Sequence, residues 1–183
     1  MHLLNGFRNA FTCIPVVHEM SAGIAAEHFN ETSVSGKAFA LVTTGPGLTN
    51  ILTAVAGCYV EHRELLVIGG QVKSTDLLEP PARQHGFQEI DGVRVADGIS
   101  VRSARMESPM SKTEFMALAR ESGHPHPGPV VIEICLEVQG AAVDRAQLDR
   151  AEESVAVRSN VANPQTDQFF ASLENALLSL IHI

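Results

Sequence analysis

Short, continuously apolar segments recur along the first 139 residues and alternate with amphipathic ones. The apolar segments predict strands at residues 14–17, 39–43, 65–69, 99–102 and 130–136. Strands without polar alternation are typical of parallel sheets that are covered on both faces. The amphipathic segments predict helices at residues 19–30, 48–60, 88–95 and 112–122. Repeated strand–helix units of this kind predict an α/β fold, with a doubly wound, mainly parallel sheet and helices on both faces.

The pattern changes after Gln139. Residues 140–165 are polar and mixed in charge, and we interpret them as a linker. Residues 166–183 contain an apolar-periodic stretch that predicts a helix, and a helix with nothing to pack against is marginal in water. We therefore expect one domain at residues 1–139, followed by the linker and the truncated start of a second domain.

Composition narrows the possible functions. The net charge is −8, and without a basic segment nucleic acid and anionic membranes are not expected as partners. The chain has no signal peptide and no apolar run long enough to span a membrane, so a cytoplasmic location is expected. Cys13, Cys58 and Cys135 each lie among apolar neighbours and are expected to be buried and free. No Cys/His spacing fits zinc, so no metal ligand is assigned to this chain.

Two features stand at the carboxyl ends of neighbouring predicted strands, where open α/β sheets bind ligands. Glu19 begins the helix after the first strand, and the sequence TTGPGLTN occupies residues 43–50 after the second. Gly45, Pro46 and Gly47 lack bulky flexible side chains, so the backbone can approach a flat ring closely. Two other interpretations stay open. Glu19 would then only complement a helix dipole, or the glycine-rich turn would bind phosphate, although no dinucleotide or Walker spacing is present.

Several motifs together resemble the N-terminal, pyrimidine-binding domain of thiamine-diphosphate-dependent enzymes, and within them the acetolactate synthase group. In family order they are HEMSAG (18–23), TGPGLTN (44–50), VIGGQV (67–72), RQHGFQEID (83–91) and HPGPVVIEI (126–134). The resemblance covers residues 3–139 and implies the thiamine-diphosphate-binding fold. Family members have a strand before the first helix, whereas this sequence starts inside that helix. We therefore expect the sheet to lack its first strand, which would leave unpaired backbone groups beside the empty position.

The resemblance implies that Glu19 is the catalytic residue. In the family a glutamate hydrogen-bonds N1′ of the cofactor's aminopyrimidine, and proton exchange there activates the cofactor. Such exchange near neutral pH calls for partial desolvation of the carboxyl group. His18 either positions Glu19 or is an ordinary strand-end residue. The cofactor-binding residues that the resemblance implies are Glu19, Thr44, Gly45, Pro46, Gly47 and Asn50.

Three further residues match family positions near the substrate channel: Gln71, Phe87 and Gln88. A structural role is equally open for the two glutamines, and Phe87 would line the channel or an interface. Asn50 would either contact the ring or hold the loop.

The implied activity is that of an acetolactate-synthase-like carboligase or decarboxylase, a transferase or lyase acting on 2-oxo acids. In the family, Mg²⁺ and the diphosphate are held by a domain with a Gly-Asp-Gly motif that this sequence lacks, so the isolated chain is expected to be inactive. That domain would come from the rest of a longer chain or from a partner subunit, in a homodimer or larger assembly. FAD binding and the individual substrate stay undecided. Two alternatives are a separate subunit of a two-chain 2-oxo acid decarboxylase and a non-catalytic assembly module of the same fold.

Overall fold

A parallel sheet forms the centre of the computed structural model, which describes residues 2–79, 81–123, 126–142 and 172. The strand order is β1-β2-β4-β3, and every neighbouring pair is parallel. The strands are β1 (Ala40–Val42), β2 (Leu65–Gln71), β3 (Arg102–Met106) and β4 (Pro129–Cys135). The α-helices are α1 (His2–Ala10), α2 (Glu19–Thr32), α3 (Pro46–Glu61), α4 (Gly92–Ala96) and α5 (Lys112–Arg120).

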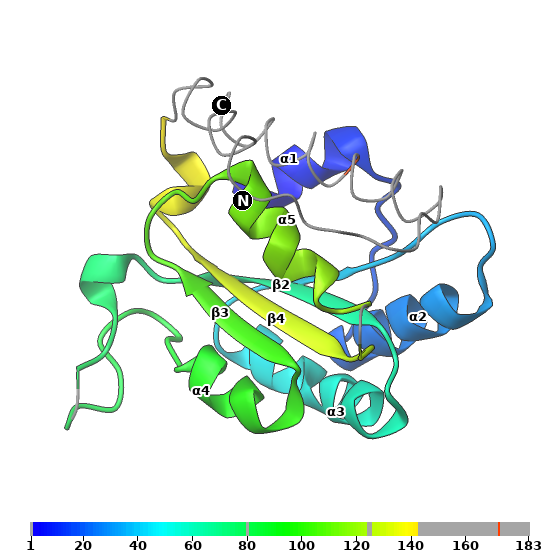
Figure 1. Cartoon of the computed structure of the whole chain (residues 1–183). Coiled ribbons are helices and arrows are strands. Elements are labelled where there is room, and N and C mark those ends of the chain that lie inside the picture. The colour runs from blue at the N-terminus through cyan, green and yellow to red at the C-terminus, as the bar shows by residue number, and fades with distance from the viewer. Residues whose placement is uncertain (1, 80, 124–125, 143–171, 173–183) are drawn as a thin grey trace.

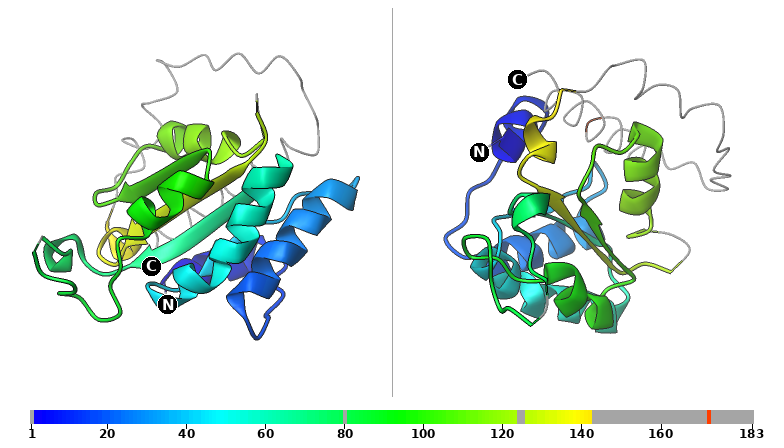
Figure 2. Two further views of the ribbon diagram at one scale, coloured as in Figure 1. Left: turned by 90° about the horizontal axis from the view of Figure 1, so that it is seen from below. Right: turned by 90° about the vertical axis from the view of Figure 1, so that its left-hand side faces the viewer.

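Helices cover both faces of this sheet, as the views in Figures 1 and 2 agree. Helices α1 and α5 lie on one face, where Phe7 and Phe115 join a core cluster with Leu66 and Ile68 of β2. Helices α2, α3 and α4 lie on the other face, where the cluster includes Leu65 and Val67 of the same strand. Successive residues of β2 therefore enter opposite cores, which explains why the strand is apolar without alternation. The predicted doubly wound α/β fold is confirmed.

The strand predicted at residues 14–17 is wrong. Residues 12–16 have no regular secondary structure, Ile14 is 80% exposed and Val17 is fully exposed. An apolar segment forms a strand only where a neighbour supplies backbone partners, and among the described residues β1 pairs with β2 alone. The same segment carries Cys13, which is exposed and not buried as predicted. Cys58 and Cys135 are buried, and burial raises the pKa of each thiol to about 12.

Two other boundaries differ from the prediction. Strand β3 begins at Arg102, where the predicted strand ended, and Asp97–Ile99 form a 3-10 turn. As an edge strand, β3 is partly exposed, so its sequence lacks the apolar continuity on which the prediction relied. Helix α4 is shorter than predicted because Asp91 caps it, its side chain accepting from Arg94 N at 3.2 Å.

The remaining predictions concern the C-terminal part of the chain. Val138–Gly140 form a 3-10 turn at the end of the described domain. The rest of the predicted linker and the start of the second domain, apart from residue 172, lie outside the described residues. None of the described helices combines the length and apolar character that a membrane crossing requires.

Asn30 ties α2 to the amino-terminal side of the sheet. The residue is 7% exposed, and its Nδ2 donates to the carbonyls of Ala38 and Glu64 at 3.0 and 3.2 Å. Its Oδ1 accepts from Ala38 N at 2.7 Å. Asn30→Ala should lower the free energy of unfolding by about 2–3 kcal/mol, because buried backbone groups lose their partners. Urea denaturation measures this loss.

Asn9→Ala is the matched control, since Asn9 is exposed on α1. We expect a change within about 0.5 kcal/mol for this variant. Equal losses for the two variants would contradict the role given to Asn30.

Candidate functional site

Glu19 is the first residue of α2. The preceding His18 caps the helix, with its Nδ1 accepting from Met20 N at 3.2 Å. Gly23, four residues after Glu19, allows α2 to approach α3 closely, since a Cβ there would lie 2.5 Å from Ala54 Cβ. Because the helices approach so closely, the first turns of α2 and α3 meet. Asn50 of α3 donates through Nδ2 to Glu19 Oε2 at 3.0 Å.

The glycine-rich turn packs directly against Glu19. Gly47 would place a Cβ 3.5 Å from Glu19 Oε1 and 2.7 Å from Thr43 Cγ2, so no side chain separates the turn from the carboxylate. Gly45 caps α3 with φ 59° and ψ −110°, a conformation that L side chains rarely adopt. Pro46 occupies the first helical position, where its missing N–H leaves no bond unmade.

The electrostatics of Glu19 differ from the expectation. Its side chain is partly exposed, and the hydrogen bond from Asn50 lowers its pKa, followed by a bond from its own backbone N–H and by the charge of His18. Partial desolvation of the carboxylate does raise the pKa, but the two hydrogen bonds and the charge of His18 outweigh that effect, so the pKa stays below its ordinary value. Raising the pKa toward neutral pH requires that the carboxylate be covered.

Gln71 lies beneath the turn and is 3% exposed. Its Oε1 accepts from Thr44 Oγ1 at 3.0 Å and from Val72 N at 2.8 Å. Its Nε2 donates to Ile90 O at 2.9 Å and to Glu133 Oε1 at 3.0 Å. These bonds use the full capacity of the amide, so the geometry favours the structural role that the sequence left open.

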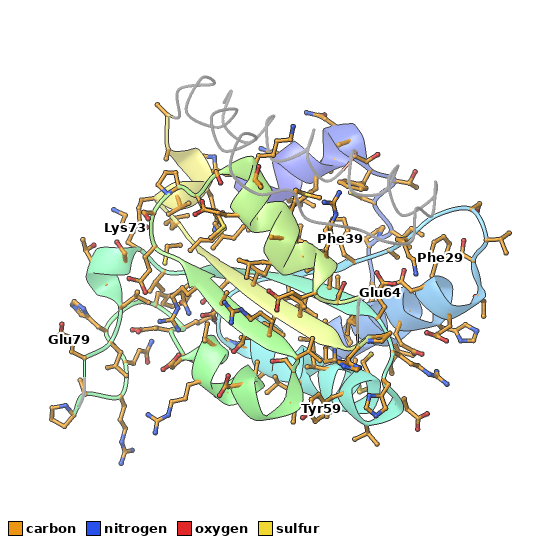
Figure 3. All side chains as sticks on the ribbon, in the orientation of Figure 1. Phe29, Phe39, Tyr59, Glu64, Lys73 and Glu79 are labelled. Carbon is orange, nitrogen blue, oxygen red and sulfur yellow. The ribbon has the colours of Figure 1, made fainter. Side chains whose placement is uncertain are left out.

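The loop between β2 and α4 is folded around Glu89, which is 6% exposed. Its carboxylate accepts from the backbone N–H groups of Leu78, His85 and Gly86, the latter two at 2.9 Å. Burial raises the pKa of Glu89, but these three bonds outweigh it and hold the pKa below its ordinary value. The loop projects away from the sheet (Figure 1), and Figure 3 shows Glu79 far out on it.

The same loop brings Phe87 and Gln88 back to the glycine-rich turn. Gln88 has φ 56°, unusual for a residue with a side chain, and a Cβ on Gly45 would lie 1.9 Å from its carbonyl oxygen. Phe87 is 81% exposed. Gln88 thus contacts the turn, and Phe87 is its neighbour in the chain; their prediction as substrate-channel residues stays a prediction.

A groove of about 510 Å³ opens at the carboxyl ends of β1 and β2, beside α1. Its lining is mainly apolar but includes Lys73 and Asp76. Thr44, Gln71 and Phe87 line it, whereas Glu19 and Asn50 do not. The glycine-rich turn therefore separates two parts of the site, the carboxylate at the helix ends and the groove.

The roles of Glu89 and Glu133 are not evident from the sequence alone. Glu133 is fully buried in the middle of β4, and a lone carboxylate in an apolar strand is the signal that marks it. Glu89 lies inside a quoted motif, but nothing in its spacing reveals which backbone groups it binds. Within the described ranges there is no group of three or more His, Cys, Asp or Glu side chains placed to hold a metal ion.

Comparison with known proteins identifies the family to which this chain is similar. Residues 1–95 match the family model for the thiamine pyrophosphate enzyme, N-terminal TPP binding domain. The chain is 28% identical over 173 residues to the acetolactate synthase large subunit of Buchnera aphidicola subsp. Acyrthosiphon pisum, covering 92% of this chain and 28% of that protein. It is 33% identical over 129 residues to the probable acetolactate synthase large subunit of Methanocaldococcus jannaschii, covering 69% and 21%.

A third relative is the acetolactate synthase isozyme 3 large subunit of Escherichia coli (strain K12). The identity is 31% over 144 residues, covering 77% of this chain and 23% of the relative. The chain thus spans less than a third of the length of each of these relatives.

The Glu89 bonds predict a pH-dependent stability. At pH 7, Glu89→Gln should lower the free energy of unfolding by about 1–3 kcal/mol, because a charged acceptor of three backbone N–H groups is lost. The folded pKa lies below the ordinary 4.5, so this stabilisation is present above pH 4.5 and disappears as the pH falls through the folded value. Urea denaturation between pH 7 and more acidic conditions should therefore show the two proteins converging.

Glu79→Gln serves as the control, because Glu79 is exposed in the same loop. It should change stability by no more than about 0.5 kcal/mol. A penalty for Glu89→Gln that stayed constant as the solution was acidified would show that the carboxylate charge does not hold the loop.

Proposed function

Because the chain belongs to the thiamine pyrophosphate enzymes, as their N-terminal TPP-binding domain, we propose that it is the pyrimidine-binding part of an acetolactate-synthase-like enzyme. The proposed activity is carboligation or decarboxylation of 2-oxo acids. The relatives described above are acetolactate synthases. The observation that carries the proposal is the carboxylate of Glu19, held by Asn50 and set directly against Gly47.

The residues present fit an aminopyrimidine. Such a ring is flat and carries a ring nitrogen, N1′, that accepts a proton. Gly47 places no side chain over the partly exposed carboxylate of Glu19, which is free to meet the ring nitrogen, whereas the space beside Gly45 is filled by the Gln88 carbonyl. When bound, thiamine diphosphate supplies an acidic carbon that adds to a carbonyl group and an electron sink for decarboxylation.

Glu19 is the proposed catalytic residue, and it acts by sharing a proton with N1′. Asn50 orients the carboxylate by binding Oε2. This bond also lowers the pKa, so the chain by itself keeps Glu19 largely ionised at neutral pH. Covering by the diphosphate-binding domain removes water from the carboxyl group and raises its pKa toward the range in which it exchanges a proton.

The groove beside the turn is the proposed substrate channel. Thr44, Gln71 and Phe87 line it, and the carbonyl of Gln88 closes against the turn at Gly45. Its apolar walls suit the alkyl part of a 2-oxo acid, and Lys73, which lines it together with Asp76, carries a charge opposite to that of the acid.

The rest of the site is assigned to another domain. We assign the diphosphate and Mg²⁺ to a diphosphate-binding domain, located in the same longer chain or in a partner subunit, within a homodimer or larger assembly. The coding sequence beside this one distinguishes these arrangements: an in-frame Gly-Asp-Gly segment supports one chain, and an adjacent separate frame supports two.

The chain alone should be a poor cofactor binder. Its described residues provide groups for the aminopyrimidine, whereas the diphosphate partners are assigned elsewhere. We expect titration calorimetry with thiamine diphosphate and Mg²⁺ to show binding weaker than micromolar, and incubation with pyruvate to yield no acetolactate. Saturable micromolar binding, or measurable acetolactate, would contradict this division of the site.

Glu19→Gln tests the catalytic assignment in the site completed by the diphosphate-binding domain. The amide keeps the shape of the side chain but cannot shuttle a proton. Cofactor affinity should change modestly, while exchange of the cofactor's C2 proton, followed by NMR in D₂O, should slow by about 10²–10⁴-fold.

The control for this test is Glu31→Gln, which alters an exposed carboxylate on the same helix. Glu27 is unsuitable because it is paired with Arg63. We expect Glu31→Gln to leave C2 exchange unchanged. Exchange near the wild-type rate in Glu19→Gln would show that Glu19 is not the activating acid.

A further inference from the structure

Glu133 is an unusual residue for the centre of a sheet. It lies within β4, a strand that is buried throughout, and its side chain is 0% exposed. Burial raises its pKa, and the bonds from Arg105 and Gln71 oppose that rise. An ionised carboxylate in such surroundings is unfavourable unless its oxygens are paired. The partners of Glu133 therefore show what the carboxylate organises.

Each oxygen of Glu133 reaches a different neighbouring strand. Oε2 accepts from Arg105 Nε of β3 at 2.9 Å, and Oε1 accepts from Gln71 Nε2 of β2 at 3.0 Å. A carboxylate only accepts hydrogen bonds. The Glu133 carboxylate and the Ile90 carbonyl are both acceptors, so the Nε2 group of the Gln71 amide must face them. The Oε1 side of the amide then faces Thr44, whose hydroxyl donates to it at 3.0 Å.

Glu133 also contacts the segment that packs on the other side of the turn. A Cβ on Gly92 would lie 2.2 Å from Glu133 Oε1 and 1.9 Å from Leu48 Cδ2. Gly92 is thus wedged between the carboxylate and Leu48, the residue that follows Gly47. Asp91 secures this arrangement, since it accepts from Arg105 Nη2 at 2.7 Å and caps α4. Thr44 and Leu48, on either side of the glycines, are both linked to Glu133.

We propose that Glu133 is a positioning residue for the glycine-rich turn, acting through Gln71 on Thr44 and through Gly92 on Leu48. The inference rests on the proposed function for the statement that this turn receives the cofactor. A buried ion pair is often replaceable by apolar side chains without loss of stability. Here the Glu133 carboxylate not only pairs with Arg105 but also orients the Gln71 amide, which an apolar residue would not do.

A double-mutant cycle tests the link. Glu133→Gln and Thr44→Val, singly and together, are made in the full 183-residue chain, and amide hydrogen exchange of residues 44–50 is followed without cofactor. Each single variant should speed exchange there by about tenfold. The double variant should exchange no faster than the faster single variant, because both changes break one chain of bonds. Additive effects would overturn the proposal.

Gln71→Met provides a second route that keeps the buried ion pair intact. It removes the amide between Glu133 and Thr44, so it should reproduce the faster exchange of residues 44–50 even if Glu133→Gln proves too unstable to study. Wild-type exchange in Gln71→Met would contradict the proposal. A merely structural pair of Glu133 and Arg105 would predict that wild-type result.

Glu64→Gln is the matched control. It breaks a carboxylate pair with Lys37, 2.5 Å long, just before the first residue of β2. Figure 3 shows Glu64 and Lys73 at opposite ends of this strand. Exchange of residues 44–50 should stay within about twofold of wild type in this variant. Because exchange is measured without cofactor, failure of this proposal is distinguishable from failure of Glu19→Gln to slow C2 exchange.

Discussion

The close approach of two backbone segments, at Gly45 and Gln88, constrains everything around the site. A Cβ at position 45 would lie 1.9 Å from the Gln88 carbonyl oxygen, and the backbone at Gly45 has φ 59°, so both space and conformation require glycine. Gln88 has an unfavourable backbone conformation, with positive φ. The three hydrogen bonds from backbone N–H groups to neighbouring Glu89 offset the cost of that conformation. Turn and loop thus form one unit, and Phe87 is presented at the groove as a consequence.

The parallel sheet explains why these segments meet at all. Because β1 and β2 run in the same direction, the turn after β1 and the loop after β2 leave the sheet at one edge. Glu19 reaches that edge by a different route, without a strand before it. Its place is set by α2, which Gly23 lets pack against α3, and by Asn30 at the other end of the helix. Helix packing therefore positions the acid, whereas the sheet positions the turn.

The sequence predicted best what depends on local pattern. Strands β2 and β4 are apolar throughout because both faces are covered, and the glycines of the turn are visible without knowledge of their neighbours. Residues 14–17 have the same apolar character, but a strand also needs a partner, and no local pattern reports its presence. The partners of Glu89 and Glu133 come from distant parts of the chain, so their roles appear only once the fold brings them together. The lowered pKa of Glu19 was missed for the same reason, since it arises first from Asn50, on another helix.

That lowered pKa has a consequence for how the proposed enzyme would work. A carboxylate that is partly exposed, with its pKa lowered by the hydrogen bond from Asn50, holds its negative charge at neutral pH and carries no proton to share. The same bond keeps the side chain pointed at the turn. The described residues therefore orient Glu19 but do not give it the raised pKa that proton exchange requires. Under the proposed function, covering by a second domain would remove solvent from Glu19, and this desolvation would oppose the effect of the Asn50 bond on the pKa. Under the proposed function, Asn50 and the packing of α2 on α3 fix the position of Glu19, and assembly would supply the higher proton affinity that exchange with N1′ requires.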